Sequence, residues 1–249
     1  MFPILQLGPL AIRLPGLIAL AAVWVALDIA SREGKRLGLS AEHVYNAGFY
    51  GLVGGLVGAR LWYVATYWSV YQTELLAIFS LNPATLSLTG GLVTGLMVAA
   101  WYIRRRALPL RLLLDSTALA LAVFAAGLAL ANLASGDAYG APTRLPWAIY
   151  LWDDYRHPTQ VYDLLVALAI FGLLGRLKRD RPFDGYLFLT FVTLYALAHL
   201  LLEPLRGDSL IGAGGVRAAQ VVALLALMAS MWLMRLWAQP TASTVETAP

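Results

Sequence analysis

The stretch LLLDSTALALAVFAAGLALANL, residues 112–133, holds one charged side chain, Asp115. About 20 predominantly apolar residues are needed to carry a helix across the roughly 30 Å hydrocarbon core of a bilayer. A strand with an open edge would leave backbone groups unsatisfied in lipid, so a helix is the expected form. The stretch therefore predicts a membrane-spanning helix with Asp115 in its first turn, where the helix dipole favours a carboxylate.

Further apolar stretches flank this one on both sides. They lie near residues 12–30, 45–68, 86–103, 158–175, 185–202 and 217–237. Together with residues 112–133 they predict an all-α integral membrane protein, a bundle of seven transmembrane helices that forms one domain over residues 1–238. Residues 239–249 are short and polar, which predicts a disordered tail.

The composition supports a membrane protein and excludes several other classes. Of the 249 residues, 60% are hydrophobic and 13% are charged, whereas a soluble domain carries roughly 25% charged residues. The chain contains no Cys, which excludes disulfides and thiolate metal sites. Its histidines, at 43, 157 and 199, lack the spacing of a metal-binding motif, so we expect neither a metal nor another cofactor.

Basic residues are concentrated in alternate connections between the predicted spans. The connections after the first, third and fifth spans and the end of the seventh hold 12 of the 18 Lys and Arg residues: Arg32, Lys35, Arg36, Arg104, Arg105, Arg106, Arg111, Arg176, Lys178, Arg179, Arg181 and Arg235. Loops rich in Lys and Arg stay in the cytoplasm. This pattern predicts an outside N-terminus and a cytoplasmic C-terminus. The net charge of +4 is then explained by topology, and we expect no nucleic-acid partner.

Arg60 lies two-thirds of the way along the predicted span 45–68. Ionisable residues at membrane depth are costly and often functional. One interpretation is an anion site, such as a site for lipid phosphate, because the glycine-rich face over 51–58 indicates packing inside the bundle. The alternative is an arginine that snorkels to the outer headgroups beside Trp62.

His199 and Glu203 are four residues apart at the end of span 185–202, and Arg206 is three residues further on. This spacing places all three on one helical face. The face then offers a base, its carboxylate partner and a phosphate-binding cation. The alternative is a helix-stabilising salt bridge near the outer interface.

Two polar blocks end one predicted span and begin the next. The block ANLASGDAYG, residues 131–140, contains Asn132 and Asp137, which could face a polar cavity, although a plain helix-ending loop would look similar. The block RHPTQVYD, residues 156–163, opens the following span with more polar residues than a helix cap requires.

These blocks, in this order and topology, resemble the prolipoprotein diacylglyceryl transferases. The segment AGFYGLVGGLVGARLWYV at 47–64 is similar to the family's glycine-rich second span with its arginine, and LTGGLVTG at 88–95 to its His-Gly-Gly-Leu segment. ANLASGDAYG follows the family's signature around an asparagine. RHPTQVYD is similar to Arg-His-Pro-Ser-Gln-Leu-Tyr-Glu, and HLLLEPLRGD at 199–208 to Arg-x-x-x-Glu-x-x-Arg. The resemblance covers residues 40–237 and implies seven spans with an outside N-terminus.

The resemblance also implies a function. Members of the family transfer a diacylglyceryl group from phosphatidylglycerol to the lipobox cysteine thiol of a prolipoprotein, at the bacterial cytoplasmic (inner) membrane, and release glycerol phosphate. The expected catalytic residues are His199, Glu203, Asp137 and Asn132. The residues expected to bind the lipid phosphate are Arg60, Arg206 and Arg156. Those expected to shape the cavity are Gly90, Gly91, Gly136, Gly140, His157, Gln160 and Tyr162.

Several positions of the family pattern are replaced in this chain. The histidine before Gly-Gly is Thr89, the arginine three residues before the signature asparagine is Ala129, and the arginine of the sixth span is His199. A departing phosphate needs cations, and removing one such group can cost roughly 2.7–4 kcal/mol of barrier. His199 retains part of this function if it is protonated or acts as a base.

Two alternatives to the transferase therefore stay open. One is a diverged paralogue that binds lipid or lipoprotein without transfer, or that moves another group. The other is a small-solute transporter, which is less favoured because the sequence shows no inverted repeat.

Overall fold

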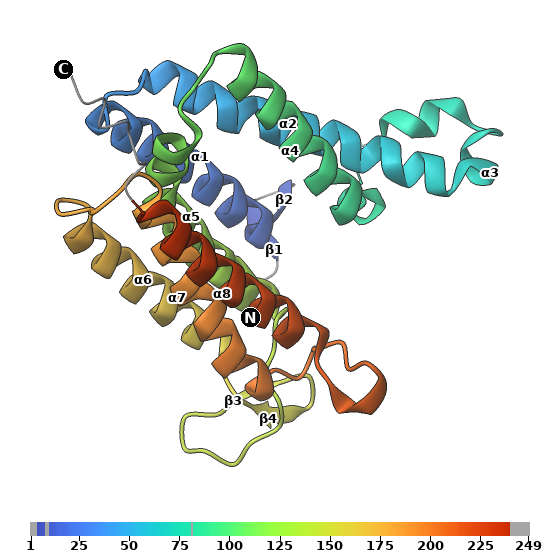
Figure 1. Cartoon of the computed structure of the whole chain (residues 1–249). Helices are drawn as coiled ribbons and strands as arrows, with labels where there is room; N and C mark the ends of the chain where they lie inside the picture. Colours follow the sequence, from blue (N-terminus) through green and yellow to red (C-terminus); the bar gives the residue numbers. More distant parts are fainter. Residues whose placement is uncertain (1–3, 8–9, 81, 240–249) are drawn as a thin grey trace, which may run out of the picture. The chain divides into compact units, whose positions relative to one another are not determined.

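The computed structural model of the chain describes residues 4–7, 10–80 and 82–239. Long helices follow the predicted spans closely (Figure 1). They are α1 (Leu14–Arg36), α2 (Ala41–Thr66), α4 (Leu88–Arg105), α5 (Leu110–Ser135), α6 (Thr159–Leu177), α7 (Tyr186–Leu202) and α8 (Ala218–Trp237). The predicted tail lies outside the described residues from 240 onward.

Short elements fill the connections. They are the strands β1 (Ile4–Leu7), β2 (Leu10–Arg13), β3 (Ile149–Leu151) and β4 (Asp154–Arg156), the helix α3 (Trp68–Tyr71) and the 3-10 turns η1 (Leu75–Phe79), η2 (Pro83–Thr85), η3 (Glu203–Leu205) and η4 (Ala213–Gly215). β1 pairs with β2 and β3 with β4, each as an antiparallel hairpin. The sequence did not predict these hairpins, because each is too short to show the alternation of a strand.

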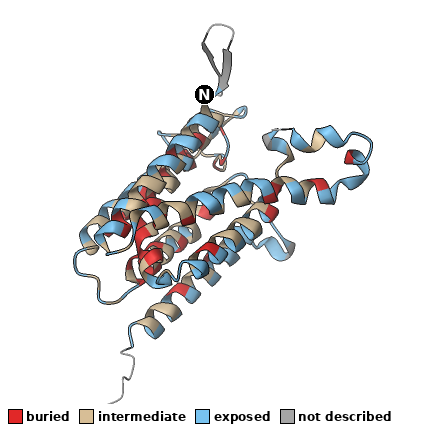
Figure 2. Cartoon of the chain, turned by 90° about the horizontal axis from the view of Figure 1, so that it is seen from above, coloured by how far each residue is buried: buried red, intermediate tan, exposed pale blue. Residues whose placement is uncertain are grey.

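Five of the long helices are long and apolar enough to cross a membrane: α1, α5, α6, α7 continued to Leu205, and α8. Many residues along the long helices are exposed (Figure 2). Large apolar side chains are among them, such as Leu225, Met228 and Trp232 of α8. Lipid is the solvent that such side chains fit. The protein is therefore a multi-pass helical membrane protein. α2 and α4 fall short of this apolarity because α2 contains Arg60 and several glycines and α4 ends with Arg104 and Arg105, so a count of seven spans stays a prediction.

The chain divides into two compact units. Unit 1 comprises residues 1–30 and 114–249, and unit 2 comprises residues 31–113. The prediction of a single domain over residues 1–238 is not tested by this division, because lipid-embedded helices need few contacts with one another to share a membrane.

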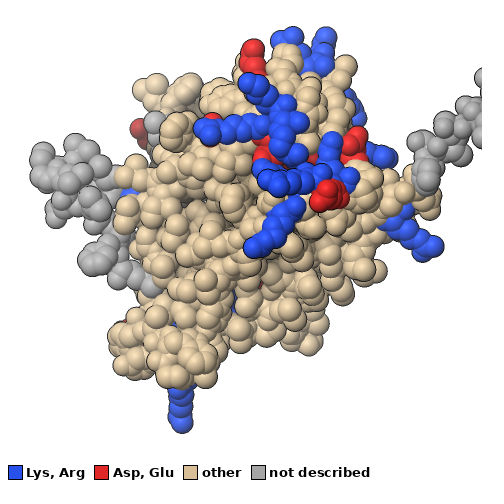
Figure 3. Space-filling model, turned by 90° about the vertical axis from the view of Figure 1, so that its left-hand side faces the viewer, with Lys and Arg blue, Asp and Glu red and all other residues tan. Residues whose placement is uncertain are grey.

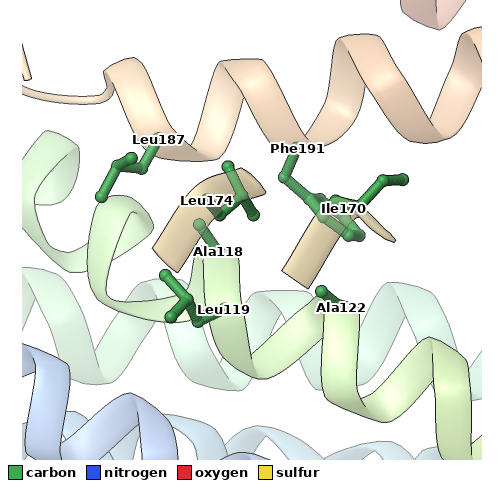
Figure 4. Packing of buried hydrophobic residues seen from close by; sticks show 7 residues of the cluster. All are labelled: Ala118, Leu119, Ala122, Ile170, Leu174, Leu187 and Phe191. Atoms are coloured by element: carbon green, nitrogen blue, oxygen red, sulfur yellow. The ribbon is translucent and has the colours of Figure 1, made fainter. Parts of the chain in front are cut away.

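The core of unit 1 lies where α5, α6 and α7 meet (Figure 4). Its buried side chains are Ala118, Leu119, Ala122, Ile170, Leu174, Leu187 and Phe191. The small alanines of α5 let the larger side chains of α6 and α7 approach its backbone closely. α8 packs on α7, where the hydroxyls of Thr193 and Ser230 are hydrogen-bonded at 2.9 Å.

Asp115 is almost completely buried, with 1% of its surface exposed. Its carboxylate accepts hydrogen bonds from the backbone amides of Gly185 and Phe188, at 2.8 and 3.1 Å, and pairs with Arg181 at 3.1 Å. The prediction placed Asp115 in the first turn of its own helix. This was wrong, because α5 begins at Leu110, and the helix whose N-terminus the carboxylate stabilises is α7.

The core of unit 2 is a close crossing of α2 and α4. A Cβ atom on Gly95 would lie 2.8 Å from the carbonyl oxygen of Gly51, and one on Gly58 would overlap the side chain of Thr94. Small residues at such an interface let two helix backbones approach. The expectation that the glycine face of α2 packs against another helix is confirmed.

Lys and Arg side chains are grouped on the surface shown in Figure 3. In unit 1, Arg176, Lys178, Arg179 and Arg181 follow the C-terminal part of α6, and Arg235 is in the last turn of α8. A Cβ atom on Gly185 would meet the ring of Trp237, so the start of α7 and the end of α8 lie together. This basic end of unit 1 is opposite the end at which α6 begins and α7 stops.

Candidate functional site

Three of the motif blocks meet at that opposite end of unit 1. Gly140 and Arg206 form an antiparallel bridge, with the amide of Ala141 donating to the carbonyl of Leu205 at 2.7 Å and that of Gly207 to the carbonyl of Tyr139 at 2.9 Å. The amide of His157 donates to the carbonyl of Ala141 at 3.1 Å. Backbone hydrogen bonds thus join the segment after α5 to the segments before α6 and after α7.

Side chains at the start of α6 strengthen this junction. The hydroxyl of Thr159 donates to the carbonyl of Ala138 at 2.6 Å, and the amide nitrogen of Gln160 donates to the carbonyl of Asp137 at 2.8 Å. Both side chains are fully buried. The loop needs such partners because Gly136 and Ala138 have positive φ values of 85° and 54°, and the strained turn is held only by its surroundings.

Two glycines of the junction occupy positions at which no other residue fits. A Cβ atom on Gly140 would overlap the backbone of His157, and one on Gly207 would lie 2.6 Å from the carbonyl oxygen of Gly140. The prediction that Gly140 shapes the site through close backbone approach agrees with this packing.

Arg206 is the centre of the charged groups here. Its Nη1 lies 3.3 Å from Asp163, its Nε and Nη2 each lie 3.1 Å from an oxygen of Asp208, and its Nε lies 3.9 Å from Glu203. Burial tends to lower the pKa of Arg206, but the hydrogen bond to Asp208 and the three carboxylate charges raise it overall. The guanidinium therefore stays charged, with three acidic neighbours.

The prediction of one helical face for His199, Glu203 and Arg206 was wrong for Arg206. α7 ends at Leu202, Pro204 lies in a 3-10 turn, and Arg206 has the extended values φ −82° and ψ 142°. Proline cannot continue a hydrogen-bonded helix, so the chain leaves the helical face at this point.

His199 lies on the last turn of α7 and close to this charged group. Its ring is edge-on to Tyr195, with 4.5 Å between the ring centres, and the charges of Asp163, Arg206 and Glu203 act on it. Glu203 is buried, and its ion pair is with Arg206. The catalytic partnership of His199 with Glu203 stays a prediction, and the structure adds Asp163 and Tyr195 as neighbours.

Asn132 and Asp137 stand where α5 ends. The carbonyl of Asn132 accepts a hydrogen bond from the amide of Gly136 at 2.8 Å, which closes the helix. Its side chain is half-buried, whereas that of Asp137 is exposed. The backbone carbonyl of Asp137 is bound by Gln160, so its carboxylate is the part that a ligand could meet.

Arg156 is bound mainly to the protein itself. Its Nε donates to the carbonyl of Leu151 at 3.0 Å and its Nη1 to that of Gly140 at 3.4 Å, while its guanidinium lies 5.0 Å from the ring centre of Tyr139. These contacts fasten the β3–β4 hairpin to the junction. A phosphate-binding role for Arg156 stays a prediction. Its hydrogen bonds stabilise the loop between α5 and α6.

The remaining residues that were expected to shape a cavity, His157, Gln160 and Tyr162, lie at or just before the start of α6. The hydroxyl of Tyr162 accepts a hydrogen bond from the indole of Trp147 at 2.8 Å, and the ring of His157 is 6.3 Å from that of Tyr162. His157 Nδ1 and Gln160 Oε1 are buried and have no hydrogen-bond partner among the described residues. Buried polar atoms of this kind commonly bind water or a ligand.

Arg60, in unit 2, organises the connection between α2 and α4. Its Nε donates to the carbonyl of Ile78 at 2.8 Å, its Nη1 to the carbonyl of Thr85 at 3.1 Å, and its Nη2 to that of Ala77. Its guanidinium also lies 5.3 Å from the ring centre of Tyr71. The donors of Arg60 are thus largely used within unit 2, and phosphate binding by Arg60 stays a prediction.

The positions that replace family residues are also placed. Thr89 is exposed in the first turn of α4, next to Gly90 and Gly91, which are packed against α2. Ala129 is buried in α5, with 3% of its surface exposed, so its small size is part of the packing of unit 1.

Four residues of the site were missed as functional candidates: Asp163, Tyr195, Asp208 and Arg217. Asp163 and Asp208 each end a motif block, and this was the available signal. Arg217 donates to the carbonyls of Glu203 and Arg206, each at 2.9 Å, and to Ser209 at 2.7 Å. Its contacts come from a turn that no local pattern predicts.

Comparison with known proteins agrees with the arrangement of the blocks. The family model for prolipoprotein diacylglyceryl transferase matches residues 3–236. The chain is 33% identical over 245 residues to the phosphatidylglycerol–prolipoprotein diacylglyceryl transferase of Geobacillus kaustophilus, covering 93% of this chain and 91% of the relative. It is 29% identical over 213 residues to the protein of that name from Clostridioides difficile, with 86% of each chain covered. The chain therefore belongs to the prolipoprotein diacylglyceryl transferase family.

Proposed function

We propose that this protein transfers a diacylglyceryl group from phosphatidylglycerol to the cysteine thiol of a lipobox peptide in a prolipoprotein. The observation that carries this proposal is the junction of three motif blocks around Arg206 and His199. Relatives that share most of the length of the chain are named for this reaction.

The reaction needs a thiolate, a carbon electrophile and a stabilised leaving group. The peptide sulfur forms a bond to the glycerol carbon, the bond from that carbon to the phosphate oxygen breaks, and glycerol phosphate departs with the electron pair. The thiol proton goes to His199, and the charge on the phosphate is met by Arg206. Asn132, Asp137, Gln160 and Tyr162 shape the polar surroundings.

We also propose that the chain crosses the bacterial cytoplasmic membrane seven times, with its N-terminus outside and its C-terminus in the cytoplasm. The basic connection between α6 and α7 lies at the end of unit 1 that is opposite Arg206. Basic connections stay in the cytoplasm, so the junction faces outward. A lipobox cysteine of an exported protein reaches the membrane from that side.

The test uses purified protein in detergent with phosphatidylglycerol and a lipobox peptide, followed by mass spectrometry. We expect a diacylglyceryl mass gain that disappears when the cysteine of the peptide is replaced by serine. His199→Ala should lower the rate by about 10²- to 10⁴-fold, the usual contribution of a general base. The matched control is His43→Ala, since His43 lies in unit 2, where its ring is hydrogen-bonded to Tyr102 at 3.1 Å.

A second candidate function is a lipid- or lipoprotein-binding paralogue without this activity. The observation in its favour is the burial of Ala129, which leaves no room for the arginine of the family pattern without a shift of neighbouring atoms. Phosphatidylglycerol binding without any mass gain, beside an active relative in the same assay, would favour the paralogue. Transfer by the wild-type protein that His199→Ala leaves unchanged would instead refute the role of His199.

A further inference from the structure

The guanidinium of Arg206 presents two different edges to two different carboxylates. Its Nη1 is held by Asp163 of α6 at 3.3 Å. The Nε and Nη2 atoms form a two-pronged edge, and each lies 3.1 Å from one oxygen of Asp208. A paired geometry of this kind is the one with which arginine also binds phosphate oxygens. Asp208 thus occupies the edge that a phosphate would use.

Asp208 is the carboxylate of the cluster that can leave most easily. Its side chain is 30% exposed, compared with 19% for Asp163 and 4% for Glu203. Turning the Asp208 carboxylate into water costs little desolvation energy, whereas Glu203 is buried and Asp163 is fixed on a helix. When Asp208 leaves, Asp163 still holds Arg206 in place.

The residues on both sides of Asp208 are held by hydrogen bonds, Gly207 through its backbone and Ser209 through its side chain. The amide of Gly207 is bonded to Tyr139, and the hydroxyl of Ser209 accepts a hydrogen bond of 2.7 Å from Arg217. A movement of Asp208 is therefore confined to its own side chain. The exchange of one anion for another needs no rearrangement of the junction.

The charges of the cluster favour this exchange. Arg206 carries one positive charge and is surrounded by Asp163, Glu203 and Asp208. A phosphate that binds with Asp208 still in place would add a fourth anion to one cation. Movement of Asp208 into solvent removes the carboxylate that is closest to the incoming ligand.

We propose that Asp208 is an internal anion that occupies the phosphate-binding edge of Arg206 and is displaced by the phosphate of the lipid substrate. Asp208 then sets the affinity of this edge for the headgroup phosphate, because the two anions compete for the same donors of Arg206. This inference rests on the proposed function, in which Arg206 binds the phosphate. The recognised chemistry is a phosphate ester, either in a lipid headgroup or in free glycerol phosphate.

The test compares Asp208→Asn with the wild-type protein in the full-length chain. The KM for phosphatidylglycerol is measured at saturating lipobox peptide, and we expect it to fall by about threefold to tenfold, as expected for the loss of a competing, partly exposed ion pair. Asp208→Glu keeps the charge and should retain a KM close to that of the wild type. Asp180→Asn, in the exposed connection between α6 and α7, is the matched control for the loss of one negative charge.

Two binding measurements separate the possible sources of the phosphate. Native mass spectrometry counts phosphatidylglycerol retained from lipid nanodiscs, with phosphatidylcholine nanodiscs as the comparison. Inhibition by free glycerol phosphate is measured in the transfer assay. Stronger retention of phosphatidylglycerol by Asp208→Asn supports exchange with a lipid headgroup, and stronger inhibition alone supports exchange with the free ester.

The outcomes for the two proposals differ. If the wild-type protein transfers the lipid and the KM of Asp208→Asn is unchanged or higher, the exchange is refuted and the proposed function stands. If the wild-type protein does not transfer the lipid, the proposed function fails. The exchange is then tested by whether Asp208→Asn retains more phosphatidylglycerol than the wild-type protein. A merely structural role of Asp208 would lower kcat or the unfolding temperature without lowering KM. Asp208→Ser replaces Asp208→Asn if the latter does not fold.

Discussion

The carboxylate of Asp115 in α5 accepts a hydrogen bond of 2.8 Å from the backbone amide of Gly185, which is 70 residues later in the chain. A helix N-terminus has backbone amides without partners, and here a side chain from another helix supplies one. Arg181 balances the buried charge at 3.1 Å. The contact fixes where α7 begins relative to α5 and so positions the far end of α7, which carries His199.

Replacement of Asp115 should therefore destabilise unit 1. Asp115→Ala leaves two backbone amides without their acceptor and removes the buried ion-pair partner of Arg181, and we expect a loss of about 3–5 kcal/mol, the usual cost of removing one partner of a buried pair. The measurement is thermal unfolding in detergent. Asp184→Asn is the control, because Asp184 is 52% exposed and pairs with the same Arg181 at 3.5 Å. Equal losses of stability for Asp115→Ala and Asp184→Asn would show that the bonds of Asp115 to the start of α7 do not stabilise unit 1.

The crossing of α2 and α4 should be sensitive to one added methyl group. Gly58→Ala places a Cβ atom on Thr94, so we expect a loss of about 1–3 kcal/mol from overpacking. Gly172→Ala is the matched change, since a Cβ atom at that helical position meets nothing within 4 Å. That variant should be neutral or stabilised by up to about 1 kcal/mol. The two variants are compared by their unfolding temperatures in the same detergent. An unchanged unfolding temperature for Gly58→Ala would contradict the close crossing of α2 and α4.

Arg60 should control the order of the segment between α2 and α4. Arg60→Lys keeps the charge but cannot reproduce the forked contacts with the carbonyls of Ala77, Ile78 and Thr85. Hydrogen exchange over residues 75–87 should become about tenfold faster or more, which corresponds to the loss of at least roughly 1.4 kcal/mol of local stability. Arg105→Lys is the control, because Arg105 stacks on Trp101 outside this segment. Unchanged exchange in Arg60→Lys would leave Arg60 available for the predicted phosphate role.

The orientation of unit 1 can be tested by labelling, because the chain contains no Cys. A single cysteine introduced by Pro146→Cys, in the exposed connection before β3, should react with a membrane-impermeant maleimide on intact spheroplasts. One introduced by Asp180→Cys, in the connection between α6 and α7, should react only after permeabilisation. The reverse pattern would invert the proposed topology.

Helix positions were predictable because long apolar runs end at clear signals. The predictions 185–202 and 217–237 differ by one residue at their beginnings from Tyr186–Leu202 and Ala218–Trp237. α1 is the exception, since it continues to Arg36 beyond the predicted residue 30. Its last turns are polar and are stabilised by pairs such as Glu33 with Arg36, which hydropathy does not detect.

The blocks that meet at the junction were predictable from the sequence, but the contacts between their side chains were not. The three blocks could be identified because each still matches polar residues of the family pattern, and because they follow one another in the same order. Spacing along a helix then suggested that Glu203 serves His199, whereas Glu203 pairs with Arg206. That pairing depends on the turn at Pro204 and on the bridge to Gly140, both of which arise from tertiary contacts.

The bridge between Gly140 and Arg206 is made from main-chain atoms, as are the hydrogen bonds from Ala141 to Leu205 and from Gly207 to Tyr139 beside it. Hydrogen bonds between main-chain atoms do not depend on the side chains of the residues that form them, so this bridge tolerates substitutions that add no atoms at Gly140 or Gly207. The presence of His199 in place of the arginine of the family pattern is therefore compatible with an unchanged bridge between Gly140 and Arg206. Gly140 and Gly207 are the positions of this bridge at which any added side chain would collide with neighbouring backbone.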